Sequence, residues 1–271
     1  MSGVIILNTF LKWPGGKRWL LHDLEKYINI DYNRYFEPFV GGGAVLFFLN
    51  PPCSTISDIN SDLINLYIVM RDNTEELKAI LQDHQKKHNK SYYYKIRALK
   101  LDDPIEKAGQ MLYLNRACFN GMFRVNQKGD FNVPIGTKSN FVYDLHLFED
   151  YSNVLKKCNI INSDFESIIN DAQKNDLIFA DPPYVTNTLN NGFIKYNEKL
   201  FTWDDQNRLL DSLVRARDRG SIIISTNAYF KELVDMYLNA GFKVQILSRK
   251  STISGKKESR QETKELFITS I

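Results

Sequence analysis

Short apolar runs bounded by turn residues alternate with helix-length amphipathic segments along much of the chain. The apolar runs predict strands at 35–40, 54–58, 159–163, 177–181 and 221–226. The amphipathic segments predict helices at 203–218 and 229–239, and 44–49 reads as the start of another helix. Strands that alternate with helices in this way form mostly parallel sheets, so we expect an α/β fold. Two further runs, 242–248 and 265–271, predict an antiparallel hairpin at the edge of that sheet.

A long segment in the middle of the chain breaks this alternation. Residues 60–117 show helical periodicity with many charges and contain no strand-like run. After them, 123–133 alternates around a central turn as the arms of a β-hairpin do. We therefore predict a main α/β domain formed by 1–58 and 139–271, with an inserted helical and hairpin domain at 59–138.

The composition allows a sizeable core, because the chain has 271 residues of which 43% are hydrophobic. A formal charge of +3 neither requires nor excludes a polyanionic partner. Cys53, Cys118 and Cys158 show no spacing typical of a disulfide framework or a zinc site, which suits a reducing cytoplasm. The apolar runs at 4–7 and 40–49 are too short to cross a bilayer. We expect a cytoplasmic protein that is neither exported nor bound to a membrane.

The most informative motif is Asp181-Pro182-Pro183-Tyr184, which follows the predicted strand at 177–181. Open α/β sheets bind their ligands beyond the carboxyl ends of the strands, so this motif lies where a ligand is expected. It offers a carboxylate acceptor, a carbonyl oriented by proline geometry, and an aromatic ring on which a flat base can stack. An exocyclic amine fits such a group. The alternative is an ordinary Pro-Pro turn that closes a strand.

A glycine cluster, Gly41 to Gly43, follows the first long apolar strand and precedes a helix. Such a loop provides a tight turn and a helix N-terminus that favours a negatively charged group. Asp58, at the end of the next predicted strand, is placed like the acid that binds ribose hydroxyls in nucleotide-binding folds. The departure from G-x-G-x-x-G favours a cofactor with an adenosine and a carboxylate but no pyrophosphate. Alternatively, Asp58 caps the helix that begins near Asn60.

These motifs, together with LKWPGGK at 11–17, resemble the Dam family of DNA adenine-N6 methyltransferases. The resemblance spans most of the chain and keeps the family's order of segments. The matching blocks are LKWPGGK at 11–17, EPFVGGG at 37–43, SDINSDLINLY at 57–67, YLNRACFNGMFRVNQKGDFNVPIG at 113–136, DPPY at 181–184 and FTWDDQ at 201–206. Ordered blocks of this length make the resemblance highly specific.

The resemblance implies a Rossmann-like methyltransferase sheet and the cofactor S-adenosylmethionine (SAM), which leaves as S-adenosylhomocysteine, with no metal. It implies methyl transfer to N6 of adenine in double-stranded DNA, within GATC. Asp181 and Pro182 then accept hydrogen bonds from the target amine, and Tyr184 stacks on the flipped base. The residues implied to bind the cofactor are Trp13, Lys17, Phe39, Gly41, Gly43, Asp58, Asp164, Phe165 and Asp181. A core aromatic is the alternative for Phe165.

The resemblance also implies where the DNA sequence is read. The residues implied to contact DNA are Lys12, Asn120, Met122, Arg124, Pro134 and Lys138. Arginine can bridge O6 and N7 of guanine, so Arg124 is the main candidate for reading a base, and a surface cation is its alternative. Basic clusters at 86–100 and 249–264 are either solvated faces or phosphate contacts. We expect the segment 187–200 to become ordered on DNA.

Three other functions remain open at this point. An RNA adenine methyltransferase could use the same DPPY motif, although a hairpin suits the major groove of DNA better than structured RNA. A protein glutamine methyltransferase usually carries Asn where Asp181 stands. A DNA-binding module without catalysis is the third, and the intact motif argues against it. A restriction endonuclease is an expected companion rather than a stable partner.

Overall fold

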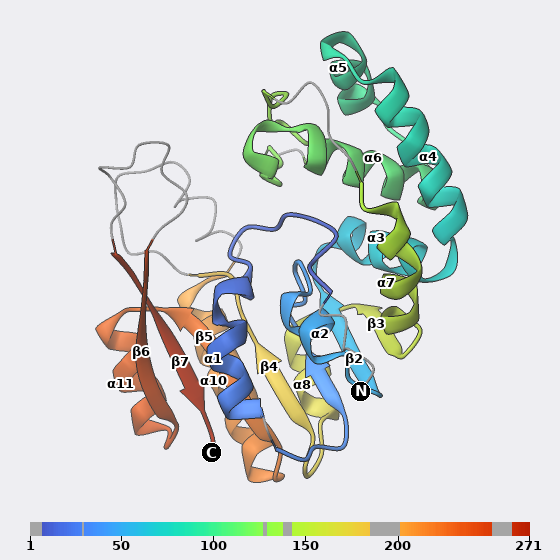
Figure 1. The fold of residues 1–271 in the computed structure, drawn as a ribbon. Helices are drawn as coiled ribbons and strands as arrows, with labels where there is room; N and C mark the ends of the chain where they lie inside the picture. Colours follow the sequence, from blue (N-terminus) through green and yellow to red (C-terminus); the bar gives the residue numbers. More distant parts are fainter. Residues whose placement is uncertain (1–6, 29, 127–128, 138–142, 185–200, 251–261) are drawn as a thin grey trace. The chain divides into compact units, whose positions relative to one another are not determined.

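A computed structural model describes residues 7–28, 30–126, 129–137, 143–184, 201–250 and 262–271. Its strands form a seven-stranded sheet in the order β3-β2-β1-β4-β5-β7-β6 (Figure 1). The strands are β1 (Tyr35–Glu37), β2 (Ser54–Asp58), β3 (Cys158–Asn162), β4 (Leu177–Ala180), β5 (Ile222–Ala228), β6 (Lys243–Lys250) and β7 (Glu262–Thr269). Each predicted strand is present, which confirms the predicted α/β fold.

The pairing of the strands defines the edge at which the chemistry is expected. β1 pairs in parallel with both β2 and β4, and β4 pairs in parallel with β5. The carboxyl ends of β1, β2 and β4 therefore lie at the same edge of the sheet. β7 runs antiparallel between β5 and β6, which confirms the predicted hairpin. Asp58 ends β2 and Asp181 follows β4, so both acids belong to that edge.

The chain divides into two compact units, and one of them contains most of the sheet. This sheet unit comprises 31–39, 54–57 and 163–271. Its helices are α8 (Phe165–Asp171), α10 (Trp203–Asp218) and α11 (Lys231–Asn239), which lie on one face of the sheet (Figure 1). Strands β4 and β5 are both buried along their length, β4 with apolar residues throughout and β5 with the polar residues Ser225, Thr226 and Asn227 in its second half. Helix α10 begins with a capping box between Thr202 and Asp205.

The other unit is mainly helical and comprises 1–30, 40–53 and 58–162. Its elements outside β3 are η1 (Lys17–Leu20), α1 (Leu21–Ile28), α2 (Ala44–Leu49), α3 (Ser61–Asp72), α4 (Thr74–Lys87), α5 (Lys90–Ala98), α6 (Pro104–Ala117), η2 (Phe119–Gly121), η3 (Leu145–Leu147) and α7 (Phe148–Leu155). The side chains of Asn60, Asn89 and Asp103 cap α3, α5 and α6. The helical prediction for 60–117 is therefore confirmed.

The boundaries between these two units differ from the predicted domain boundaries. Helix α7 packs on α3 and α4, so 139–162 belongs to the helical unit by its contacts. The domains 1–58 with 139–271, and 59–138, stay a prediction. Within the described ranges, no helix is both long enough and apolar enough to cross a membrane.

Candidate active site

Asp181 follows β4 and is held in place by a neighbouring strand. The hydroxyl of Thr226 donates to Asp181 Oδ1 over 2.7 Å. Ser225 is paired with Ala180 in the β4–β5 register, and its hydroxyl donates to the carbonyl of Ala180 over 2.8 Å. Thr226 is 1% exposed, whereas Asp181 is half-buried. The sheet therefore restrains the carboxylate of a residue that is itself only half-buried.

Tyr184, at the end of the same motif, is anchored by a buried acid. Its hydroxyl donates to Glu265 Oε2 over 2.7 Å, and Glu265 is 1% exposed in β7. Burial and the neighbouring carboxylates of Asp181 and Glu265 hold the pKa of Tyr184 well above its usual range. Pro182 is buried and Pro183 is exposed. The predicted catalytic residues thus lie in one turn whose two ends are hydrogen-bonded to β5 and β7.

In the helical unit, the glycine loop and Asp58 are connected directly. The backbone N–H of Gly41 donates to Asp58 Oδ2 over 3.1 Å, and that of Asn60 donates to Oδ1 over 3.0 Å. Burial raises the pKa of Asp58, while these N–H groups act in the opposite direction. Asn60, not Asp58, caps α3 through its side chain. Asp58 is therefore a half-buried acceptor, and α3 does not use it as its side-chain cap.

The glycine loop is so closely packed that larger residues would not fit at Gly41 and Gly43. Gly41 and Gly43 have φ angles of +46° and +67°, in the left-handed region. A Cβ on Gly41 would lie 2.9 Å from Trp13 Cδ1, and one on Gly43 would lie 2.6 Å from the hydroxyl of Tyr67. That hydroxyl donates to the carbonyl of Gly41 over 3.0 Å. The structure therefore brings the predicted residues Trp13, Gly41, Gly43 and Asp58 together.

Trp13 also contacts the segment predicted to read DNA. Its ring stacks on Phe123 with 4.9 Å between centroids and an angle of 24° between planes. The neighbouring Lys17 is buried and donates to the carbonyl of Gly15 over 2.8 Å. One aromatic residue thus contacts both the glycine loop and the hairpin.

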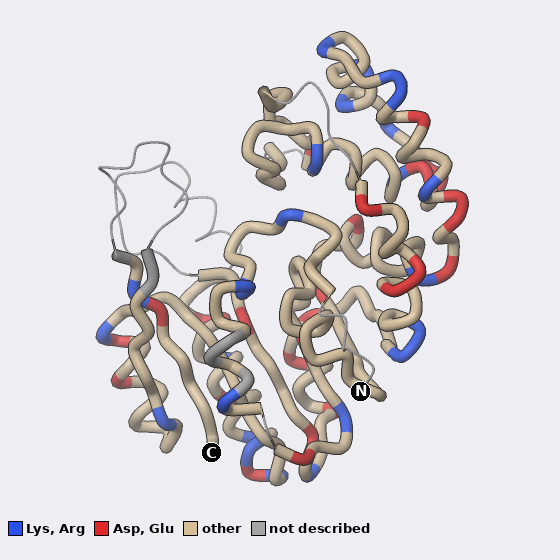
Figure 2. Tube along the Cα trace, in the orientation of Figure 1, with Lys and Arg blue, Asp and Glu red and all other residues tan. Residues whose placement is uncertain are grey.

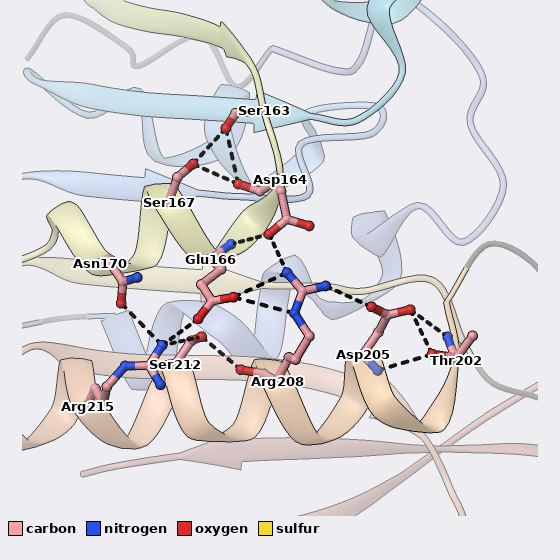
Figure 3. A network of polar contacts seen from close by, with 10 residues as sticks. All are labelled: Ser163, Asp164, Glu166, Ser167, Asn170, Thr202, Asp205, Arg208, Ser212 and Arg215. Carbon is pink, nitrogen blue, oxygen red and sulfur yellow. Dashed lines mark hydrogen bonds and ion pairs between the residues drawn. The ribbon is translucent and has the colours of Figure 1, made fainter.

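Asp164 caps the start of α8 in the sheet unit, Phe165 is the first residue of that helix, and Figure 3 shows Asp164 within a polar network. Asp164 Oδ1 accepts from the N–H of Glu166 over 3.0 Å and from Arg208 Nη2 over 2.9 Å. The Arg208 guanidinium lies 4.9 Å from the centroid of the Phe165 ring. Phe165 is buried and lies 5.3 Å from the ring of Phe39. These contacts agree with a core aromatic and with a wall of a binding site alike.

The residues predicted to contact DNA converge on the turn after α6. The Asn115 amide accepts from the N–H of Lys12 over 2.9 Å and donates to its carbonyl over 2.7 Å. Asn120 is exposed with a φ of +56°, and Phe119 beside it is 43% exposed. Gly121 has a φ of +64°, in the left-handed region that favours glycine, and a Cβ there would also meet the Lys12 side chain. The exposed Phe119 ring is a candidate for stacking on a base.

Arg124 is oriented within the predicted hairpin. Its Nε donates to Asn132 Oδ1 over 2.8 Å, and neither terminal nitrogen donates to a described residue. The hairpin prediction is confirmed as a short antiparallel bridge between Val125 and Phe131. The fork of the guanidinium is therefore available for two acceptors, as reading guanine requires.

Two other predicted contacts flank the hairpin. Met122 is half-buried, and Pro134 is exposed with its carbonyl accepting from the N–H of Phe119 over 2.9 Å. Lys138 and the segment 187–200 lie outside the described residues.

Sequence reasoning missed several residues that hold these groups in place. They are Thr226, Glu265, Asn115, Arg208 and Asn132. Each is a polar residue far along the chain or on another element, and each lacks a motif of its own. For Thr226 and Glu265, the sequence did offer one indication, since each is a polar residue at a position of a predicted strand that should face the core.

Replacing Thr226 with valine should lower the rate of the reaction in which Asp181 is predicted to act. Valine keeps the shape of threonine but removes the donor to Asp181, so the carboxylate loses one restraint. We expect kcat to fall about tenfold, since a hydrogen bond to a charged group is worth about 1.5 to 3 kcal/mol. Thr226→Ser keeps the hydroxyl and serves as the control. An unchanged kcat for Thr226→Val at equal thermal stability would show that this contact has no part in the reaction.

Comparison with known proteins identifies the family. Residues 13–253 match the family described as D12 class N6 adenine-specific DNA methyltransferase. The type II methyltransferase M1.LlaDCHI of Lactococcus lactis subsp. cremoris is 35% identical over 98% of this chain and 96% of its own length. The DNA adenine methylase of Haemophilus influenzae is 33% identical, covering 96% and 92% of the two chains. The type II methyltransferase M.MjaIII of Methanocaldococcus jannaschii is 33% identical, covering 94% and 96%. Because the family match spans most of the chain, this protein belongs to the D12 class of N6 adenine-specific DNA methyltransferases.

Proposed function

We propose that this DNA adenine-N6 methyltransferase uses SAM and modifies adenine within GATC. The observation that carries the proposal is the Asp181 carboxylate, restrained by Thr226 at the carboxyl end of β4 and still accessible. The exocyclic amine of a flipped adenine needs such an acceptor. The names of relatives that are DNA adenine methylases support the same chemistry.

The residues around the glycine loop fit the proposed cofactor. Asp58 is a half-buried acceptor suited to ribose hydroxyl groups, and its described partners include the backbone N–H groups of Gly41 and Asn60. The close approach of Trp13 to Gly41 leaves an aromatic edge beside that acid. We assign Lys17, Phe39, Gly43, Asp164 and Phe165 to the same role. When bound, SAM supplies an electrophilic methyl group.

Asp181 and Pro182 act on the target amine. Its lone pair is delocalised into the adenine ring, so the nitrogen is a poor nucleophile until hydrogen bonds localise the pair. The Asp181 carboxylate and the Pro182 carbonyl accept those hydrogen bonds, and positioning with oriented charge provides the catalysis. This amine is inaccessible inside a duplex, so the base has to flip out of the helix. Unstacking the base costs a few kcal/mol of free energy, which stacking on Tyr184 offsets.

Sequence reading is assigned to the turn and hairpin after α6. Arg124 presents its two terminal nitrogens while Asn132 holds Nε, which suits guanine O6 and N7. We assign Asn120, Met122, Pro134, Lys12 and Lys138 to neighbouring contacts. The duplex is favoured over RNA because a hairpin of this kind suits the major groove of B-form DNA. Relatives named type II methyltransferases support a companion restriction endonuclease.

The test is to treat unmethylated plasmid with the enzyme and SAM and to map the modified bases by sequencing. The expected result is N6-methyladenine at GATC sites and at few others. Modification at a different motif would overturn the GATC assignment alone. A duplex that stays unmodified while structured RNA becomes methylated would instead favour the RNA alternative.

Lys87 and Lys90 should contribute to the salt dependence of DNA binding. Both are exposed at the junction of α4 and α5, where Figure 2 shows basic positions, and Lys87 pairs with Asp83 over 2.7 Å. An exposed pair of this kind is weak and can give way to a phosphate. Each phosphate contact adds about 0.9 to the slope of log K against log salt. Changing both lysines to glutamine should therefore lower the slope by about 1.8. Replacing the exposed Lys243 with glutamine is the control. If the unchanged protein, the double variant and this control all show the same salt slope, Lys87 and Lys90 contact no phosphate and only add solubility.

A further inference from the structure

Glu265 is a buried acid at a position where packing alone would favour an apolar residue. It is 1% exposed, and its neighbours Leu266 and Phe267 are fully buried. Its strand β7 is paired on both sides, opposite Ala228 of β5 and Leu247 of β6. A buried carboxylate is expensive unless it is hydrogen-bonded, and an apolar side chain of similar size would avoid that penalty. The acid therefore calls for a reason other than packing.

Its contact with Tyr184 supplies that reason. The phenol donates to Glu265 Oε2 over 2.7 Å. Since burial and nearby carboxylates hold the pKa of Tyr184 well above its usual range, the phenol stays protonated and remains a donor. Because β7 is fixed between two strands, its acid is a rigid reference point for the tyrosine. The hydrogen bond therefore restricts the rotation of the Tyr184 side chain.

We propose that Glu265 is a positioning residue for methyl transfer, which orients the Tyr184 ring so that the flipped adenine stacks on it. This rests on the proposed function, in which Tyr184 supplies the stacking surface. Glu265 itself touches neither base nor cofactor and acts only through the phenol. A ring held in one orientation places the target amine against Asp181, whereas a ring free to rotate lets the base move.

The first test removes the acceptor with Glu265→Leu and keeps one with Glu265→Gln. Glu265→Leu should lower kcat about tenfold and change KM for the duplex less than about twofold, since the stacking geometry matters to the reaction more than to binding. Glu265→Gln should recover most of the loss. Glu232→Leu removes an exposed carboxylate from α11 and is the matched control.

The second test reports stacking itself. A duplex with 2-aminopurine at the target position emits more light when the flipped base is unstacked. The enzyme-bound duplex should be brighter with Glu265→Leu than with the unchanged protein. Equal emission from both complexes would overturn the proposal, because a merely structural role alters thermal stability and leaves the stacking signal in place.

Tyr184→Phe breaks the same hydrogen bond from the other side. In a double-mutant cycle, adding Glu265→Leu to Tyr184→Phe should cause no further loss of kcat. Losses that multiply would show that Glu265 acts independently of the phenol and would overturn the proposal. If Glu265→Leu does not fold, Tyr184→Phe decides alone, and unchanged 2-aminopurine emission rejects the inference. Adenine methylation by the unchanged enzyme is measured first, so that failure of the proposed function is recognised separately.

Discussion

Asp181→Ala should lower the rate of methyl transfer by about 10² to 10³-fold while leaving the protein folded. The change removes the carboxylate that we assign to the target amine, so the lone pair stays delocalised. Loss of a preorganised hydrogen-bonding group of this kind lowers kcat by about 10² to 10³-fold. The measurement is the initial rate of methyl incorporation into an unmethylated GATC duplex under saturating SAM.

Two companion variants sharpen this result. Asp181→Asn keeps the shape and one carbonyl acceptor, so it should retain more activity than Asp181→Ala. Asp211→Ala removes an exposed carboxylate from α10 and should leave the rate unchanged. Thermal unfolding of all three should agree within a few degrees. A folded Asp181→Ala protein with the parental rate would remove Asp181 from the mechanism.

Arg124→Ala should relax the choice of base at one guanine more than it lowers the maximal rate. Alanine removes both terminal nitrogens, which have no partner among the described residues and are therefore free to contact a base. A bidentate contact discriminates by about 1 to 3 kcal/mol, which corresponds to roughly 5- to 150-fold in preference. The measurement is kcat/KM on GATC and on duplexes altered at each position in turn.

The variant Arg124→Lys tests whether the charge of Arg124 or the shape of its guanidinium group sets the preference. Lysine keeps the positive charge and loses the planar fork, so preference should fall with this variant also. If the alanine variant loses activity equally on every duplex, Arg124 is a phosphate contact. In that case sequence reading belongs to other residues of the turn.

The fold was largely predictable because its signals are local. An apolar run between turn residues defined 54–58 to the residue, and the amphipathic period defined 203–218 equally well. The strand at 35–40 proved shorter, ending at Glu37, because the chain turns at Pro38 and Phe39 and proline has no N–H to continue the pairing. The identity of the DPPY motif and the glycine loop likewise depends on residues that are neighbours in sequence.

The supporting contacts were not predictable because they join distant parts of the chain. Thr226 and Asp181 are 45 positions apart, Tyr184 and Glu265 are 81 apart, and Lys12 and Asn115 are 103 apart. A periodic pattern states which face of a strand is buried, but not which side chain of another strand lies opposite. Only the strand order β4-β5-β7 places Thr226 and Glu265 beside the catalytic turn.

The order of the strands also constrains how the protein is made. β6 precedes β7 along the chain but lies outside it in the sheet, so β6 has no neighbour until β7 has been synthesised. During translation the edge of β5 therefore stays open, and exposed edges of this kind invite pairing between nascent chains. When β7 pairs with β5, that edge is closed and Glu265 comes to lie beside Tyr184 at the same time. We therefore expect enzymatic competence to arise late in folding, together with resistance to aggregation.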